Sequence, residues 1–296
     1  MSKVRFIADS SADLLKIKDV DFVSVPLTIS TSERSFIDDE RLDTHELLDY
    51  MEKYKDRSYT ACPGLSLWLD AFEGADVIYV IALSSNVSGC YNSAKSAADM
   101  YLEEHPDVKI HVFDTLTTGP EMRLFVEKVI ELDRAGLSFE EVIEQAEDYV
   151  STTRIFFAFQ SLHNLAQNGR VSKVAAAAVS ALNISIVGTG TAQGELDPFA
   201  KRRGEKHAAA EILHQLEECG YEGGKVRICH TDNKLLAQKY AVNINNRYPG
   251  ADIKIYESRG LISYYAERGG IILGVETNRV QFIEDNNIDS DEEAAE

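Results

Sequence analysis

Hydrophobic and polar positions along the first half of the chain alternate in blocks that predict strands and helices in turn. Runs rich in β-branched and aromatic residues predict strands at 4–8, 22–29, 76–83 and 109–113. Amphipathic blocks predict helices at 43–54 and from Gly89 to Glu103. Strands that alternate with helices are typical of a parallel sheet, so this part of the chain is expected to form an α/β lobe.

Two of the predicted helices carry amino-terminal signals. Asp43 precedes the first, and Glu46 stands where a capping box would return the hydrogen bond. Ser138 and Glu141 form the same pattern, and the flanking apolar residues predict a helix that runs to about residue 152.

The apolar run 155–159 predicts a strand, and a short helix at 161–168 is expected to end at Gly169. We therefore expect the boundary between two lobes near residue 160. Further helices are expected at 175–182, 205–218 and 234–247, and further strands at 184–187, 226–229, 253–256 and 270–276. The glycine-rich stretch 188–194 is expected to be a turn. The predicted fold class is α/β with two α/β lobes, 1–160 and 161–283, the first with a mostly parallel sheet flanked by helices.

Length, charge and hydropathy narrow the class of protein. The 296 residues carry a net charge of −19, and the segment 284–296 supplies seven acids without Lys or Arg, so we expect an acidic, disordered tail there. This balance argues against a nucleic-acid partner. The absence of a run of about 18 uncharged apolar residues argues against stable membrane insertion. The amino terminus lacks a signal-peptide core, so a cytoplasmic location is expected.

Cysteine and histidine positions do not suggest a metal or a disulfide framework. The cysteines form no CxxC pair and lie far apart, at positions 62, 90, 219 and 229. The seven histidines are scattered, so no metal ligand is predicted.

The loop that follows strand 76–83 is the first candidate for a binding site. It contains Ser84, Ser85 and Ser88 and a glycine turn at Gly89, directly behind a run of buried-strand character. In an open α/β sheet, ligands bind at the carboxyl ends of the strands, where a following helix offers free N–H groups. Serine and threonine side chains also commonly cap helices, which is the alternative interpretation of these residues.

Four segments together resemble the DegV family over roughly residues 4 to 280. They are Asp9–Leu14, Thr60–Gly64, Ser84–Ala94 and Asn168–Ser172. The resemblance implies a protein that binds a long-chain fatty acid in its first lobe, without a cofactor of its own. It further implies that the protein presents the acid to the ATP-binding subunit of a bacterial fatty-acid kinase.

The resemblance also implies roles for particular residues. Thr60, with Ser84, Ser85 and Ser88, is expected to grip the fatty-acid carboxylate, and Arg170 is expected near its entrance. The chain departs from the family pattern at several positions. Cys62, Gly64 and Cys90 replace the usual Gln, Ser and Thr, and the position of a family histidine is occupied by Ala266.

A basic cluster at 201–206 stands out in this acidic chain. By resemblance, Arg170, Arg202 and Arg203 are expected to dock the acidic kinase partner, and the alternative is that the cluster only solvates the start of helix 205–218.

Two other functions remain open. One is a serine-dependent acyl hydrolase or transferase that uses Ser85 or Ser88, although no base has the spacing to activate them. The other is a relic of dihydroxyacetone-kinase chemistry.

Overall fold

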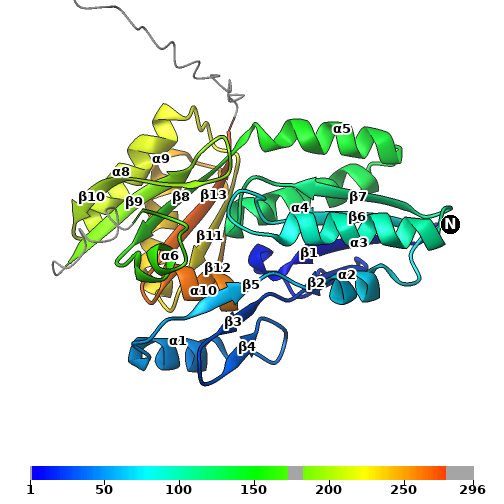
Figure 1. The fold of residues 1–296 in the computed structure, drawn as a ribbon. Helices are drawn as coiled ribbons and strands as arrows, with labels where there is room; N and C mark the ends of the chain where they lie inside the picture. Colours follow the sequence, from blue (N-terminus) through cyan, green and yellow to red (C-terminus); the bar gives the residue numbers. More distant parts are fainter. Residues whose placement is uncertain (1, 173–182, 278–296) are drawn as a thin grey trace, which may run out of the picture.

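The computed structural model describes residues 2–172 and 183–277, which form two lobes that lie side by side (Figure 1). The first lobe contains a sheet in the order β2-β1-β6-β7, and all of its pairs are parallel. Its strands are Phe22–Val25, Val4–Asp9, Val77–Ala82 and Lys109–Asp114. The predicted parallel sheet of the first lobe is confirmed.

Helices cover both faces of this sheet because successive residues of each buried strand point to opposite sides. Ile7, Ile78 and Val80 pack against α2, Leu65–Phe72, and α3, Cys90–Glu104. Phe6 and Tyr79 face the other way, toward α4, Gly119–Arg134, and α5, Phe139–Val150. Both faces are apolar, which explains why the strands are near-continuous hydrophobic runs.

The second lobe is built on a six-stranded mixed sheet in the order β10-β9-β8-β13-β11-β12. Only β11 and β12 pair in parallel. The strands, in that order, are Leu196–Arg203, Ile184–Gly190, Thr153–Phe159, Ile271–Glu276, Lys225–His230 and Asp252–Glu257. Helices α8, Glu205–Glu218, and α9, Lys234–Arg247, cover one face.

Two sequence-based expectations for this lobe need correction. A boundary near residue 160 assigns β8 to the first lobe, whereas its ladder bonds to β9 and β13 make it a central strand of the second sheet. The stretch 188–194 is not all turn, because β9 continues to Gly190 and pairs with β10, a strand that the sequence analysis did not predict. Local patterns do not reveal such pairing partners, since the partners are distant in sequence.

Helix α4 was also not predicted, although it packs against both sheets. It is buried on several sides, with Met122, Leu124, Phe125 and Val126 all nearly inaccessible, so it shows no single apolar stripe. Its first turn lies so close to β13 that a Cβ on Gly274 would come within 2.3 Å of the Glu121 amide nitrogen. Gly274 therefore permits the contact that joins the lobes.

A small antiparallel sheet, β4-β3-β5, lies beside the first lobe with strands Ser35–Ile37, Thr28–Ser30 and Tyr59–Ala61. The single strand expected at 22–29 is divided here. Pro26 lacks an amide hydrogen and lies between β2 and β3, which belong to different sheets. Two short helices, α6, His163–Gln167, and α10, Gly260–Ala266, complete the second lobe beside it.

The capping predictions have different outcomes. Ser138 and Glu141 make both bonds of a capping box at α5. Asp43 accepts from the amides of His45 and Glu46 at the start of α1, Thr44–Lys53. The Glu46 carboxylate does not return the bond and instead pairs with Arg34 at 2.8 Å.

Some expectations fall outside the described residues, namely the helix at 175–182 and the acidic tail at 284–296. Among the helices that the structure describes, none is both long and apolar enough to cross a membrane.

Candidate functional site

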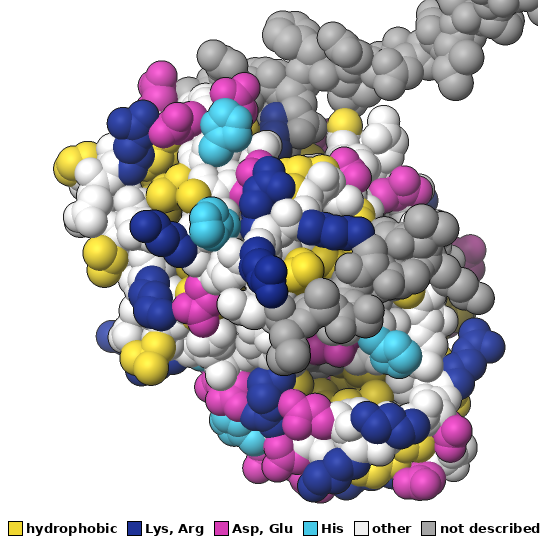
Figure 2. All heavy atoms as spheres, turned by 90° about the vertical axis from the view of Figure 1, so that its left-hand side faces the viewer, with side chains coloured by type: hydrophobic (Ala, Val, Ile, Leu, Met, Phe, Trp, Pro, Cys, Tyr) yellow, Lys and Arg dark blue, Asp and Glu magenta, His cyan; other side chains and the backbone are white. Residues whose placement is uncertain are grey.

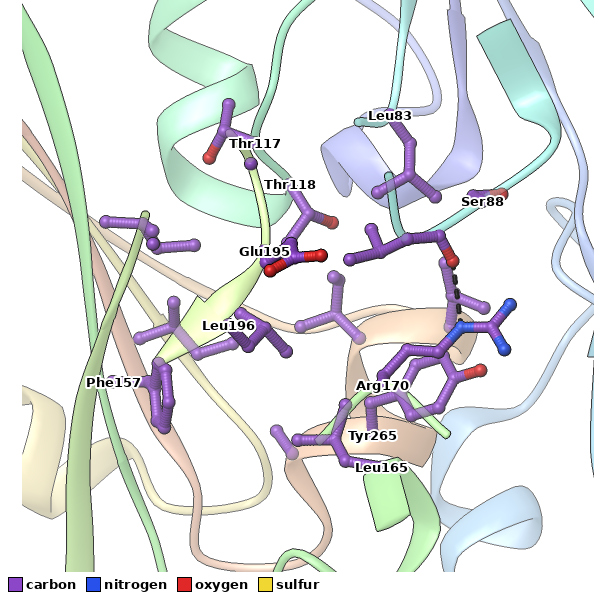
Figure 3. Close-up of a pocket in the computed structure, with 18 of the residues that line it drawn as sticks. Leu83, Ser88, Thr117, Thr118, Phe157, Leu165, Arg170, Glu195, Leu196 and Tyr265 are labelled. Carbon is purple, nitrogen blue, oxygen red and sulfur yellow. Dashed lines mark hydrogen bonds between the residues drawn. The ribbon is translucent and has the colours of Figure 1, made fainter. Parts of the chain in front are cut away.

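A cavity lies between the two lobes, where the carboxyl ends of the parallel strands face the inner side of the six-stranded sheet. About 800 Å³ of space within it is free of protein atoms, part of it open to solvent. Most lining side chains are apolar and come from both lobes (Figure 3). They include Leu27, Leu83, Val87, Leu116, Ile155, Phe157, Phe159, Leu165, Leu196, Leu261, Ile262 and Ile272.

The period of two along β8 builds one wall of this cavity. Ile155, Phe157 and Phe159 line it, whereas Phe156 and Ala158 point to the opposite face and pack beneath α8. The sequence indicated only a continuous apolar strand, because both faces of β8 are buried. The cavity therefore belongs to both lobes and is not confined to the first.

One group of polar side chains in the cavity lies around Arg170, whereas Thr117, Thr118 and Glu195 line a different part of it (Figure 3). Thr60 Oγ1 shares a 2.7 Å hydrogen bond with the hydroxyl of Tyr265. Arg170 lies beside Tyr265, and its Nε donates to the Val87 carbonyl at 2.8 Å (Figure 3). Burial raises the pKa of Tyr265, while the bond from Thr60 and the positive charge of Arg170 oppose that shift. Thr60, Ser88, Arg170 and Tyr265 are referred to below as the polar mouth.

Arg170 has no acidic ion-pair partner within the described parts of the chain. It also lines a second, polar groove outside the cavity, together with Ser85, Ser88 and Glu195. A half-buried guanidinium that faces two connected spaces can bind an anion at their junction.

The serines of the candidate loop are placed differently from one another. Ser88 lines the cavity, and its hydroxyl donates to Cys90 Sγ at 3.2 Å. Ser85 lies in the outer groove, where its backbone amide donates to Asp114. Ser84 lines neither space, because its hydroxyl is fully buried and donates to the Gly194 carbonyl at 2.8 Å.

Buried carboxylates hold the surrounding loops in place. Asp9 accepts from the Leu83 amide at 2.7 Å and from Ser11, and burial raises its pKa to about 6. Asp13 accepts from the amide of Arg259, and burial raises its pKa to about 7. These groups lie outside the cavity lining, so Asp9, which ends the first strand, has a structural role.

Helix α10 contributes residues that the sequence analysis missed. Asp38 accepts from the amides of Gly260 and Leu261 at 2.9 Å and so fixes the start of this helix. Tyr265 then reaches Thr60, and Ala266 is buried in the cavity wall. A pair of tyrosines in an apolar run gives no sequence signal of such a role.

The basic cluster lies on β10, at the edge of the six-stranded sheet. The Arg202 guanidinium forms an ion pair with Glu211 at 2.6 Å. The side chains of Lys201 and Arg203 are exposed. Basic and acidic side chains are interspersed over the face of the molecule that includes this edge (Figure 2).

One surface group has the composition of a metal site. His45, Asp232 and Glu257 are exposed, and their potential ligand atoms lie within 4.8 Å of one another. Sequence spacing could not have predicted this group, because its members come from three separate segments. Such exposed groups are common without an ion.

The fold and the cavity define a two-lobed α/β protein with an interlobe site that is lined mostly by apolar side chains and has a polar mouth. The chain belongs to the DegV family, whose model, described as an uncharacterised protein family, matches residues 3–277. A DegV domain-containing protein of Streptococcus pneumoniae is 40% identical over 276 residues, which cover 92% of this chain and 98% of that protein.

Two solved structures are similar along nearly their whole length. A DegV family protein from Eubacterium eligens, loaded with heptadecanoic acid, has a TM-score of 0.91 and 48% identity, and the match covers 93% of this chain and 99% of that one. The Streptococcus pneumoniae fatty acid kinase (Fak) B3 protein, loaded with linoleic acid, has a TM-score of 0.90 and 39% identity, with coverage of 93% and 100%.

Proposed function

We propose that this protein binds one long-chain fatty acid in the interlobe cavity, with the carboxylate at the polar mouth. The supporting observation is a cavity lined mostly by apolar side chains, with the donors of the polar mouth grouped around Arg170, in a chain whose similar structures hold heptadecanoic and linoleic acid. An apolar cavity without charged partners could not hold a carboxylate, because an ionised group loses its hydration there.

The apolar lining and the polar mouth contribute in different ways to the free energy of fatty-acid binding. Each methylene transferred from water into the cavity stabilises the complex by about 0.8 kcal/mol, so the alkyl chain provides most of the affinity. The carboxylate needs several donors at once, and we assign these to Thr60, Ser88 and Arg170. Ser85 lines the outer groove and not the cavity, and the Ser84 hydroxyl already donates to the Gly194 carbonyl.

The proposal is tested by extracting purified protein under denaturing conditions and identifying the released lipid by mass spectrometry. We expect close to one fatty acid per protein, or uptake of one by delipidated protein. Ser88→Ala should weaken binding of a displaceable fluorescent fatty acid, whereas Ser66→Ala, an exposed serine on α2, should not. Protein that is empty and takes up no fatty acid contradicts the proposal.

We further propose that the bound acid is presented to a separate fatty-acid kinase subunit, as the similarity to the Fak B3 protein supports. In this reaction a carboxylate oxygen bonds to the γ-phosphorus of ATP, the bond to the β–γ bridging oxygen breaks, and ADP leaves. The carrier supplies no cofactor. A hydrolase alternative has less support, because within the described residues no histidine forms a hydrogen bond with Ser84, Ser85 or Ser88.

The docking surface is proposed to include Arg170 at the mouth and Arg202 and Arg203 on β10. Arg202 already pairs with Glu211, so Arg203 is the cleaner residue to change. Arg203→Glu should leave fatty-acid affinity intact and slow acyl-phosphate formation, more strongly at low salt. Lys234→Glu, a charge reversal at an exposed position on α9, is the control. Equal phosphorylation rates in the two variants would remove β10 from the docking surface.

A further inference from the structure

Two side chains of the loop after β6 reach across to the tip of the β9–β10 hairpin, residues 191–195. Ser84 Oγ donates to the carbonyl of Gly194 at 2.8 Å, and Asn86 Nδ2 donates to the carbonyl of Gln193 at 2.6 Å. Both bonds join the first lobe to the second. Ser84 is fully buried, whereas Asn86 is exposed.

The hairpin tip packs closely against the first lobe at Gly194. Gly194 has a φ of +77°, and a Cβ added there would lie 2.4 Å from Ser84 Oγ and 2.7 Å from the Leu116 carbonyl oxygen. Any larger residue at position 194 would therefore displace the hairpin tip from Ser84 and Leu116, or force these two residues to move.

The same hairpin forms part of the cavity wall. Gly190, Gly194, Glu195 and Leu196 all line the cavity, where Figure 3 labels Glu195 and Leu196. Glu195 and Leu196 also line the outer groove. If the tip moved away from Ser84 and Asn86, the cavity would open beside the polar mouth. The contacts that hold the tip closed are thus two hydrogen bonds and the packing around Gly194.

We propose that Ser84 and Asn86 are positioning residues that hold the hairpin tip over the cavity and set the rate at which the ligand enters and leaves. The inference rests on the proposed function, in which that ligand is a long-chain fatty acid. Neither residue needs to touch the acid. Local opening that breaks a few hydrogen bonds is a common route to a closed binding site.

The proposal makes a kinetic prediction that a purely structural role does not. Neither Ser84 nor Asn86 lines the cavity, so weakening their bonds to the hairpin tip should accelerate association and dissociation together and leave Kd nearly unchanged. Asn86→Ala removes one bond from an exposed position and should raise both rate constants by roughly tenfold. Asn243→Ala, an exposed asparagine on α9, should change neither.

Gly194→Ala gives a second, independent test with a close control. Gly74 has a φ of +76°, almost the same as Gly194, but an added Cβ there meets no atom within 4 Å. Both alanine variants carry the same backbone strain, and only Gly194→Ala displaces the hairpin tip. We therefore expect faster fatty-acid exchange in Gly194→Ala alone.

Stopped-flow measurements with a fluorescent long-chain fatty acid, together with equilibrium titrations, distinguish the outcomes. Parallel increases in both rate constants for Asn86→Ala support the proposal. Normal Kd with unchanged rate constants in Asn86→Ala overturns it, even if Gly194→Ala fails to fold. A wild-type protein that binds no fatty acid at equilibrium refutes the proposed function, and with it this role.

Discussion

The interior of the cavity and its polar mouth are built by different physical means. The interior is lined by apolar side chains of both lobes, on β8, β10, β13 and α10 and in the loops that follow β6 and β7, and each contributes a little. The mouth depends on a few polar groups that come from separate elements and are held by single hydrogen bonds, such as Thr60 with Tyr265. Conservative substitutions in the interior should therefore leave fatty-acid binding intact, and only the introduction of a charge should abolish it. At the polar mouth, by contrast, removal of a single polar side-chain atom should lower the affinity for the fatty acid.

The largest effect is expected from a charge placed inside the wall. Ile262→Asp puts a carboxylate into the buried cavity wall, beside the alkyl chain and away from water, so fatty-acid affinity should fall on the order of 100-fold. Fluorescence displacement measures the loss. Leu235→Asp introduces the same charge at a side chain that is 74% exposed and should bind normally. Similar affinity in both variants would contradict the assignment of the interior.

The next largest effect is expected at the charged member of the mouth. Arg170→Gln removes the guanidinium but keeps a donor, and the loss of a hydrogen bond to a charged group should weaken binding by about 1.5–3 kcal/mol. Titration at several salt concentrations measures this change. Arg203→Gln, an exposed arginine on β10, serves as the control, and equal affinities would remove Arg170 from the carboxylate site.

A smaller effect is expected at Thr60, whose hydroxyl can act directly or through Tyr265. Thr60→Val should weaken binding by about 1 kcal/mol. A double-mutant cycle with Tyr265→Phe separates the two possibilities by isothermal titration calorimetry. Additive losses indicate that each hydroxyl contacts the ligand. If the second change adds nothing, Thr60 acts only by orienting Tyr265.

The smallest effect is expected at Asp13, whose carboxylate accepts a hydrogen bond from the Arg259 amide at the start of α10. The pKa of Asp13 is about 7 in the folded protein, well above its ordinary value of 3.8. The folded state therefore binds this proton more tightly than the unfolded state. The stabilising contribution is complete below about pH 4 and declines as pH rises toward 7.

Asp13→Asn keeps an oxygen that can accept from the Arg259 amide but does not titrate. The melting temperature of this variant relative to wild type should increase from pH 5.5 to pH 8, by about 2–4 °C. Thermal unfolding at several pH values measures the difference. A difference that does not change with pH would mean that Asp13 stays ionised in the folded protein.

Local sequence patterns predicted the features whose signals lie within a few neighbouring residues. The parallel sheet, the α5 capping box and the end of α6 before Gly169 are examples, since alternation, capping and left-handed glycine all act within a few residues. Helix α4, strand β10 and the placement of β8 were missed or misassigned. Each depends on contacts with segments that are remote in sequence.

The candidate site shows the same division at the level of single residues. The residue pattern alone predicts that the loop after β6 is rich in hydroxyls and that it lies at the ligand edge of a parallel sheet. The contacts between the lobes place Ser88 at both the cavity and the outer groove, Ser85 at the outer groove alone and Ser84 against the hairpin of the other lobe. The reason is that a serine can bond to any acceptor within about 3 Å, and the fold of distant segments sets which acceptor is there.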